Sequence, residues 1–344
     1  MRSLTPPAFS SNFTAMTKSC LSGYAAALIA AAAFGGQAPK PPEQPKSGPG
    51  GSDYAHQKVV SNTFGKGDAQ YWLFEPSEPT PRSAPLVVFN HGWLAMDPAI
   101  YLGWIEHIVR RGRIVIFPRY QAGALTPPWT FARNAIQAVK LGIEELKKPG
   151  HVAPDTEQLA IVGHSAGGAI TADLAALAAA EGLPKPKAAM IVQPGRGMSR
   201  PESPFFPAAD YGKIPKDTLM LVVVGADDLV VGEIMARDVF ARTPQIPPER
   251  KSYIVVQTDR HGAPPLLADH LSPCSPVRPH AFVIGPRIDA LDFYAYWKLF
   301  DALADFAFHG KNNAYALGNT PEQRFMGKWS DGTPVKELLV KEKP

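Results

Sequence analysis

The chain has very little cysteine: Cys20 and Cys274 are its only two cysteines among 344 residues. Cys20 lies in an N-terminal segment that we expect to be removed, and the single cysteine that remains cannot form an internal disulfide. A chain of this length can bury a sizeable core without such crosslinks. The composition therefore argues against a disulfide-dependent scaffold.

A strong excess of one charge is also missing. The formal net charge is +4, charged residues make up 19% of the chain, and no run of lysine and arginine stands out. Proteins that bind nucleic acid usually carry a basic patch or stripe. We therefore expect no nucleic-acid partner, and the hydrophobic content of 45% is that of a globular protein.

Long hydrophobic runs are scarce, and the one that is present, Leu21–Phe34, is short for a membrane-spanning helix. Two basic residues, Arg2 and Lys18, precede it, and the small residues of Gly35–Ala38 follow. This order is typical of a secretory signal peptide with a cleavage site. We expect residues 1–38 to be a signal peptide, and the mature protein to be secreted or periplasmic without a stable membrane anchor.

Three further segments are predicted after residue 38. Residues 39–52 are rich in proline and glycine, which predicts a linker. Residues 53–310 form the predicted domain, and residues 311–344 a C-terminal extension packed on it.

The domain alternates short apolar runs with segments of helical periodicity. An initial hairpin followed by repeated strand–helix units predicts an α/β fold, with a mostly parallel central sheet and helices on both faces. The longest candidate insertion, Pro194–Pro215, is too short and proline-rich for a large cap domain. The expected strands are Lys58–Phe64, Gln70–Phe74, Leu86–Asn90, Arg113–Phe117, Leu159–Gly163, Ala188–Val192, Leu219–Val224 and Tyr253–Gln257. The expected helices are Ala99–Arg111, Thr130–Lys148, Ala166–Glu181, Val231–Ala241 and Ile288–Phe308.

The clearest chemical signal is the segment Gly163–Gly168, with the sequence GHSAGG, between a predicted strand and a predicted helix. A serine on such a tight turn has the G-x-S-x-G context of a nucleophile elbow. The glycines leave room for neighbouring backbone, and the helix N-terminus favours developing negative charge. Ser165 is therefore the candidate nucleophile.

With these residues the chain resembles the α/β-hydrolase superfamily over about Asp53–Phe308. The elbow is similar to those of bacterial esterases, lipases and cutinase-like polyester hydrolases. The resemblance suggests a lidless serine esterase of a cutinase-like or dienelactone-hydrolase-like branch. It implies a catalytic triad in the chain order serine, acid, histidine.

Two adjacent aspartates are candidates for the acid. The strand Leu219–Val224 is followed by Gly225, Ala226, Asp227 and Asp228. The resemblance implies Asp228 in this loop, with Asp227 as its rival.

The base should follow the next strand, because a serine hydroxyl needs a positioned base to become nucleophilic. His261 comes shortly after the end of that strand and is the predicted base, with His270 and His280 as rivals. His270 would require the loop to fold back over nine more residues. Asp259, His261, Asp269 and His270 match no zinc signature, so we expect neither a metal nor another cofactor.

The resemblance also implies an oxyanion hole. Asn90-His91-Gly92-Trp93 ends the first parallel strand and is similar to the family's His-Gly-x loop, which implies backbone N–H donors from Trp93 and Ala166. His91 and His164 are expected to pack locally, whereas Trp93, Tyr120 and Trp129 are candidates for lining the pocket.

These features predict hydrolysis of carboxylic esters through an acyl-enzyme, with a small-molecule or polymeric ester as substrate. A peptidase or a dienelactone-type lactone hydrolase could use the same three side chains. A non-catalytic binding protein on this scaffold is the alternative from another class. The sequence leaves the natural substrate and the oligomeric state open.

Overall fold

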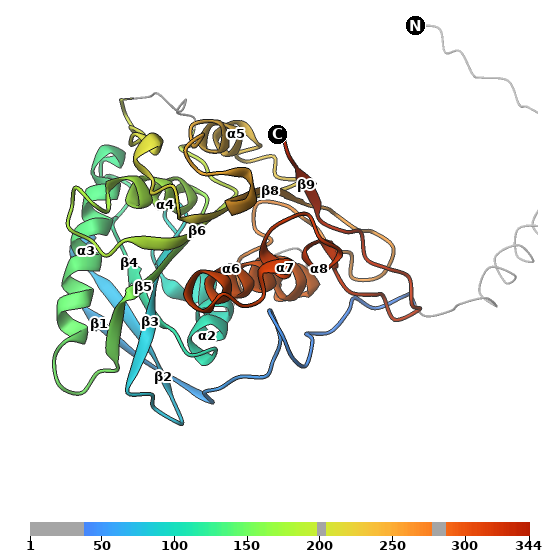
Figure 1. The fold of residues 1–344 in the computed structure, drawn as a ribbon, viewed down its shortest axis with the longest axis horizontal. Coiled ribbons are helices and arrows are strands. Elements are labelled where there is room, and N and C mark those ends of the chain that lie inside the picture. The colour runs from blue at the N-terminus through green and yellow to red at the C-terminus, as the bar shows by residue number, and fades with distance from the viewer. Residues whose placement is uncertain (1–37, 198–203, 277–286) are drawn as a thin grey trace, which may run out of the picture. The chain divides into compact units, whose positions relative to one another are not determined.

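The computed structural model describes residues 38–197, 204–276 and 287–344. The predicted signal peptide lies outside the described residues, apart from its final Ala38. A compact unit begins at Pro39 and extends to Pro344. Its elements are shown in Figure 1.

Nine strands of the described residues form one sheet in the order β1-β2-β4-β3-β5-β6-β7-β8-β9. The six strands from β4 to β8 along this order are parallel, while β1, β2 and β9 pair antiparallel at the edges. The strands are β1 (Lys58–Phe64), β2 (Tyr71–Ser77), β3 (Ser83–Asn90), β4 (Ile114–Pro118), β5 (Ala153–His164), β6 (Pro186–Val192), β7 (Leu219–Gly225), β8 (Lys251–Val256) and β9 (Leu339–Lys341).

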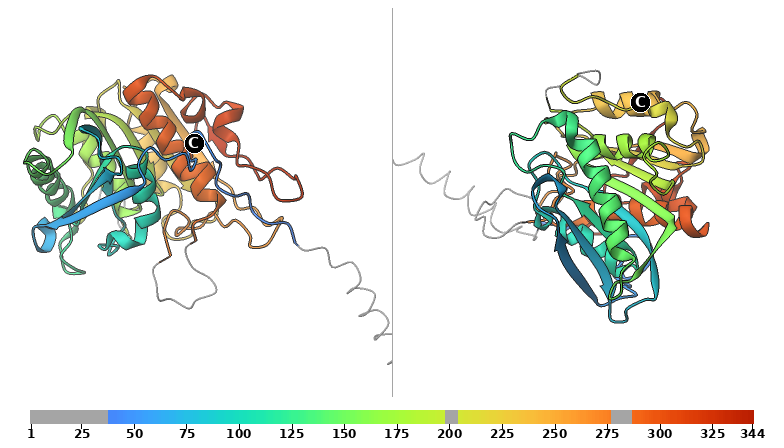
Figure 2. Two further views of the ribbon diagram at one scale, coloured as in Figure 1. Left: turned by 90° about the horizontal axis from the view of Figure 1, so that it is seen from below. Right: turned by 90° about the vertical axis from the view of Figure 1, so that its left-hand side faces the viewer.

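Helices cover both faces of the sheet, as two further views also show (Figure 2). One face is covered by α2 (Leu102–Arg110) and α6 (Trp297–His309). The other is covered by α3 (Phe131–Leu146), α4 (Ala166–Leu177) and α5 (Ile234–Ala241). A π-helical segment, Asp292–Tyr296, precedes α6. The predicted α/β architecture is confirmed.

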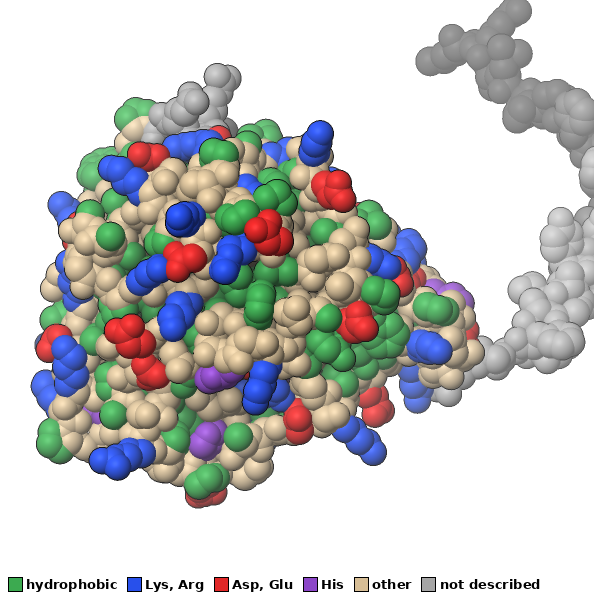
Figure 3. All heavy atoms as spheres, in the orientation of Figure 1, with side chains coloured by type: hydrophobic (Ala, Val, Ile, Leu, Met, Phe, Trp, Pro, Cys, Tyr) green, Lys and Arg blue, Asp and Glu red, His purple; other side chains and the backbone are tan. Residues whose placement is uncertain are grey.

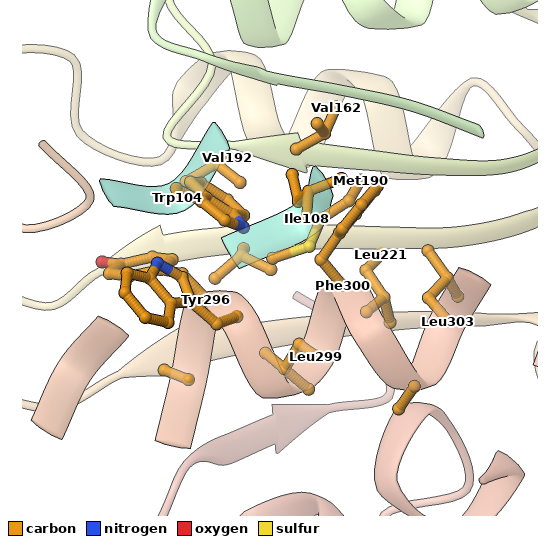
Figure 4. Close-up of a cluster of buried hydrophobic side chains, with 14 of the residues drawn as sticks. Trp104, Ile108, Val162, Met190, Val192, Leu221, Tyr296, Leu299, Phe300 and Leu303 are labelled. Carbon is orange, nitrogen blue, oxygen red and sulfur yellow. The ribbon is translucent and has the colours of Figure 1, made fainter. Parts of the chain in front are cut away.

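The sheet is buried on both faces because its central strands are almost wholly apolar. All seven residues of β7 are buried, as are the last six of β5. On the face covered by α2 and α6, residues from both helices meet side chains of three parallel strands (Figure 4). These include Trp104, Ile108, Phe300, Val162, Met190 and Leu221. Such close packing fixes the strand ends that carry the site.

Residues 39–52 lie against the domain, so they do not form the free linker that their composition predicts. The backbone N–H of Gly50 donates to Asp301 Oδ2, and the backbone N–H of Lys40 donates to Ser330 Oγ. Gly50 is buried. Composition alone did not reveal these contacts because both partners lie more than 200 residues away in the chain.

The last residues contain two short helices, α7 (Asn313–Ala316) and α8 (Pro321–Arg324), before β9 pairs with β8. The buried Lys298 of α6 donates to the carbonyl oxygens of Gln323 and Phe325 at 2.8 and 2.6 Å. Trp329 is buried as well. This extension is therefore part of the same compact unit.

The surface mixes both charges. Basic and acidic side chains are interspersed on the face seen in Figure 3, without a broad field of one sign. In the described parts of the chain, no helix is both long and apolar enough to cross a membrane.

Candidate active site

Ser165 stands at the turn between β5 and α4. Its backbone has φ 58° and ψ −123°, a strained conformation for a residue with a side chain. Two glycines make this turn possible: a Cβ on Gly163 would lie 2.3 Å from the carbonyl oxygen of Gly167, and one on Gly167 would lie 2.1 Å from that of Asn90. The predicted elbow therefore has the strand–turn–helix geometry that projects a serine hydroxyl above the sheet.

Ser165 belongs to a hydrogen-bonded line of three side chains. His270 Nε2 lies 3.0 Å from Ser165 Oγ, and His270 Nδ1 lies 2.8 Å from Asp228 Oδ2. The serine follows β5, the aspartate follows β7, and the histidine lies in the loop after β8. Because the carboxyl ends of parallel strands meet at one edge of the sheet, three distant segments converge here.

Asp228 is buried and well supplied with donors. Its Oδ1 accepts the backbone N–H groups of Val230 and Val231 at 2.9 and 3.1 Å. Burial opposes ionisation of the carboxyl, but the hydrogen bonds and charge of His270 and these N–H groups outweigh it and lower the pKa of Asp228. An ionised Asp228 accepts the Nδ1 proton of His270, which leaves Nε2 free to accept the proton of Ser165.

Asp227, the rival acid, points elsewhere. Its Oδ2 accepts from Thr258 Oγ1 at 2.8 Å and from Arg260 at 3.1 Å. Asp228 is thus the aspartate next to the histidine.

The prediction of His261 as the base is wrong in this structure. His261 pairs with Asp331 of the C-terminal extension at 2.8 Å, and 38% of its side chain is exposed. Its rival His270 occupies the place beside Ser165. The third candidate, His280, lies outside the described residues.

His270, and not His261, reaches Ser165 because the backbone after β8 forms a closed loop. Asp259 and Leu266 exchange two backbone hydrogen bonds of 2.9 Å, so residues 260–265 leave the sheet edge and return to it. The chain then runs beside β7, where the carbonyl oxygen of Ala268 accepts the backbone N–H of Asp227. This contact brings His270 over the elbow, two residues further on.

The loop predicted to supply the oxyanion hole borders the serine. A Cβ added to Gly92 would lie 3.3 Å from Ser165 Cβ. Within the described residues, the backbone N–H of Trp93 donates to no acceptor. Ala166 opens α4, where N–H groups lack an acceptor inside the helix. The two predicted donors are therefore available near the nucleophile.

The other two histidines near the elbow are buried and neutral. Burial lowers the pKa of His91 to about 4 and that of His164 to about 3. Tyr120, predicted as a pocket residue, lies fully buried and stacks on His91 with ring centroids 4.0 Å apart. Tyr120 therefore packs against the loop of His91 and does not line an open pocket.

Aromatic side chains surround the loop of Trp93. The Trp93 ring packs edge-on against Phe131 and Phe206, at centroid distances of 5.5 and 6.3 Å. Trp129 is 55% exposed and packs against Phe205. Further exposed apolar side chains lie on loops that follow the parallel strands, at Leu94, Leu125, Leu229, Val230 and Leu271.

No cluster of three or more potential metal ligands is present among the described residues. The aspartates and histidines near the end of β8 have other partners. His261 and His270 pair with different aspartates, and Asp259 accepts from Trp329 Nε1 and from the backbone of Lys336.

A serine on a strained elbow after the third parallel strand of a sheet flanked by helices, with an acid and a histidine following later strands, defines the α/β-hydrolase fold. A family model described as alpha/beta hydrolase fold matches residues 87–228, from β3 to Asp228. The chain belongs to the α/β-hydrolase superfamily and is a hydrolase of that group. No curated protein matches it. The resemblance to a cutinase-like or dienelactone-hydrolase-like branch stays a prediction.

Proposed function

We propose that the protein is a serine hydrolase that cleaves carboxylic esters through an acyl-enzyme. The observation that carries the proposal is the unbroken hydrogen-bonded line from Ser165 through His270 to Asp228. The base lies within hydrogen-bond reach of both the nucleophile and the orienting acid, which is the arrangement that nucleophilic catalysis requires.

In the acylation step, Ser165 Oγ attacks the ester carbonyl carbon while His270 Nε2 takes its proton. The carbonyl oxygen becomes an oxyanion and accepts the backbone N–H groups of Trp93 and Ala166. Asp228 stabilises the imidazolium through Nδ1. The carbon–oxygen bond to the alcohol then breaks, and His270 gives the proton to the departing alkoxide.

Deacylation repeats the sequence with water. His270 takes a proton from the water, whose oxygen attacks the acyl carbon. The bond to Ser165 Oγ breaks, the proton returns to that oxygen, and the carboxylic acid leaves. The positive end of α4 lies at the elbow throughout and favours the oxyanion.

The surroundings of the serine favour an apolar acyl group. Trp93 belongs to the oxyanion loop, and exposed apolar side chains such as Trp129 and Leu125 lie on neighbouring loops. We propose soluble short- to medium-chain esters as substrates, extending to polymeric esters. Because no cap domain is expected, the rate should show no jump when the substrate exceeds its solubility limit.

The test combines a panel of p-nitrophenyl esters of rising chain length with labelling by a fluorophosphonate. We expect ester hydrolysis, one labelled serine at position 165, and loss of both in Ser165→Ala. Ser77→Ala is the matched control, since Ser77 ends β2 and its hydroxyl bonds Thr80 rather than any group near His270. Activity confined to peptide or lactone bonds would redirect the proposal to those substrates, and an unlabelled, inactive wild type would overturn it.

We also propose that residues 1–38 direct export and are removed. The compact unit that holds the site begins at Pro39, next to the predicted cleavage position after Ala38. Sequencing the N-terminus of protein recovered outside an exporting host tests this. An exported chain that begins at Met1 or Met16 would contradict it.

A further inference from the structure

Beneath the three side chains lies a set of buried polar groups that the proposed reaction does not use. Tyr101, His164 and Gln193 are all buried, and they come from three different parts of the fold. Tyr101 ends the turn before α2, His164 precedes the nucleophile, and Gln193 follows β6. Buried polar side chains are expensive unless they are hydrogen-bonded, so their partners are informative.

The first link reaches the oxyanion loop. The backbone N–H of Gly92 donates to Tyr101 Oη at 2.9 Å, and this oxygen lies 2.9 Å from His164 Nδ1. Because burial keeps His164 neutral, one of its ring nitrogens accepts and the other donates. A hydroxyl that already accepts from Gly92 has its own proton to give to Nδ1.

Cys274 is the competing donor to that nitrogen. Its sulfur lies 4.0 Å from His164 Nδ1, and burial raises the pKa of the thiol to about 12, so it stays protonated. A thiol is a weaker donor than a phenolic hydroxyl. The hydroxyl of Tyr101 is therefore assigned to His164, which places the imidazole proton on Nε2.

The second link reaches the loop of the base. Gln193 Nε2 donates to the carbonyl oxygen of Asp269 at 2.7 Å, directly before His270. The side-chain amide of Gln193 also faces His164 and interacts with it. Gln193 Oε1 and His164 Nε2 are both buried without a hydrogen-bond partner among the described residues, so the support chain pairs them with each other.

The backbone fixes the place of Gln193. Its φ is +42°, which few residues with a side chain adopt. A Cβ at Gly225 would lie 2.5 Å from Gln193 Nε2. The amide is thus held against the start of the Asp228 turn as well as against Asp269.

We propose that Gly92, Tyr101, His164, Gln193 and Asp269 form one support chain that holds the oxyanion loop and the His270 loop in register with Ser165. Tyr101, His164 and Gln193 are positioning residues: they act through the groups that touch the substrate. This inference rests on the proposed serine-hydrolase function.

Two single variants and their controls test the support chain. Tyr101→Phe and Gln193→Met each remove one link while keeping the size of the side chain. Tyr253→Phe and Gln245→Met are matched controls, because Tyr253 bonds Glu233 and Gln245 bonds backbone carbonyls of Tyr211 and Ile214, outside the support chain. Melting temperatures establish that every variant folds.

We expect Tyr101→Phe and Gln193→Met to lower kcat on a p-nitrophenyl ester by about 10- to 100-fold with little change in KM. Small displacements of oxyanion donors or of a base reduce transition-state stabilisation more than binding. Each control should stay within about twofold. Because His164 links Tyr101 to Gln193 in the support chain, the double variant should lose much less than the product of the two losses.

The support chain would be overturned by single variants whose kcat matches that of the controls. Losses that simply multiply in the double variant would overturn it too, since independent residues behave in that way. Failure of the underlying function has a different signature, because the wild type would then not be labelled by a fluorophosphonate at Ser165. The double variant of Tyr101→Phe and Gln245→Met is the reference for independent residues, because Gln245 lies outside the support chain and the two effects on kcat should simply multiply.

Discussion

Two histidines follow the same strand, β8, and each pairs with an aspartate from another part of the chain over the same distance. His270 Nδ1 lies 2.8 Å from Asp228 Oδ2, and His261 Nε2 lies 2.8 Å from Asp331 Oδ2. The first pair is mostly buried and ends at a serine, whereas both side chains of the second pair are more than a third exposed. The distance between a histidine and a carboxylate therefore says little about its role.

A third pair sharpens the contrast. His107 Nε2 lies 2.8 Å from Asp301 Oδ2, with both side chains wholly buried. Asp301 also accepts from Arg113 at 3.0 Å and from the backbone of Gly50. The hydroxyl beside this pair is the phenol of Tyr54, 3.1 Å from His107 Nδ1, instead of a serine on an elbow, and the pair ties the N-terminal segment to α2 and α6. What surrounds a pair decides whether it is catalytic, structural or incidental.

The largest expected difference lies between the two histidines after β8. His270→Ala should reduce kcat/KM on a p-nitrophenyl ester by about 10⁴- to 10⁶-fold, since loss of the base removes the covalent route. His261→Ala should stay within about twofold. The reverse ranking would return the role of the base to His261.

The aspartates should differ almost as much. Asp228→Asn is expected to lower kcat by about 10⁴-fold, because an amide favours the wrong histidine tautomer. Asp331→Asn and Asp227→Asn should leave kcat unchanged, as neither side chain touches His270. Steady-state kinetics on the three folded variants measures this, and equal losses in Asp227→Asn and Asp228→Asn would contradict the assignment.

The buried structural pair should show in stability. Asp301→Asn is expected to lower the free energy of unfolding by about 3–5 kcal/mol, because buried cationic partners lose their counter-charge. The rate per folded molecule should hardly change. Urea unfolding followed by tryptophan fluorescence checks the first point. If Asp301→Asn were as stable as Asp331→Asn, the buried pair would contribute no more to the free energy of unfolding than the exposed one.

The smallest effect is a change in pH dependence. Burial opposes ionisation of Asp301, but His107, Arg113 and the nearby Arg111 outweigh it and hold the pKa of Asp301 well below the usual 3.8. The unfolded chain then binds more protons than the native one, so this stabilisation is present above about pH 4 and is lost as pH falls further. Between pH 5 and pH 3 the wild type should lose more stability than Asp301→Asn. Urea unfolding at each pH measures this, and equal losses of stability in the wild type and in Asp301→Asn would contradict the prediction.

Much of the site could be predicted because its signals are local. A glycine-flanked serine between an apolar strand and a helix predicts an elbow, and the Asp228 turn follows a strand of seven buried residues. Strand ends also place Trp93 near the serine. In each case the side chain and its strand are neighbours in the sequence.

The errors arose where position depends on contacts between distant segments. His261 is nearer to the end of β8, but the Asp259–Leu266 bridge turns the chain back and gives His270 the place. Gln193 carried no motif, and its link to Asp269 spans 76 residues. Packing of residues 39–52 depends on Asp301 and Ser330. Local patterns do not encode such pairings.

The short strand β9 has a consequence for the lifetime of the molecule. It pairs with β8 over Leu339, Val340 and Lys341 and covers an edge that would otherwise present unpaired backbone groups. A protease that trimmed these residues would leave Ser165, His270 and Asp228 in place, yet expose an apolar strand able to join that of a second molecule. Self-association into aggregates, rather than failed chemistry, would then limit how long a shortened enzyme stays active.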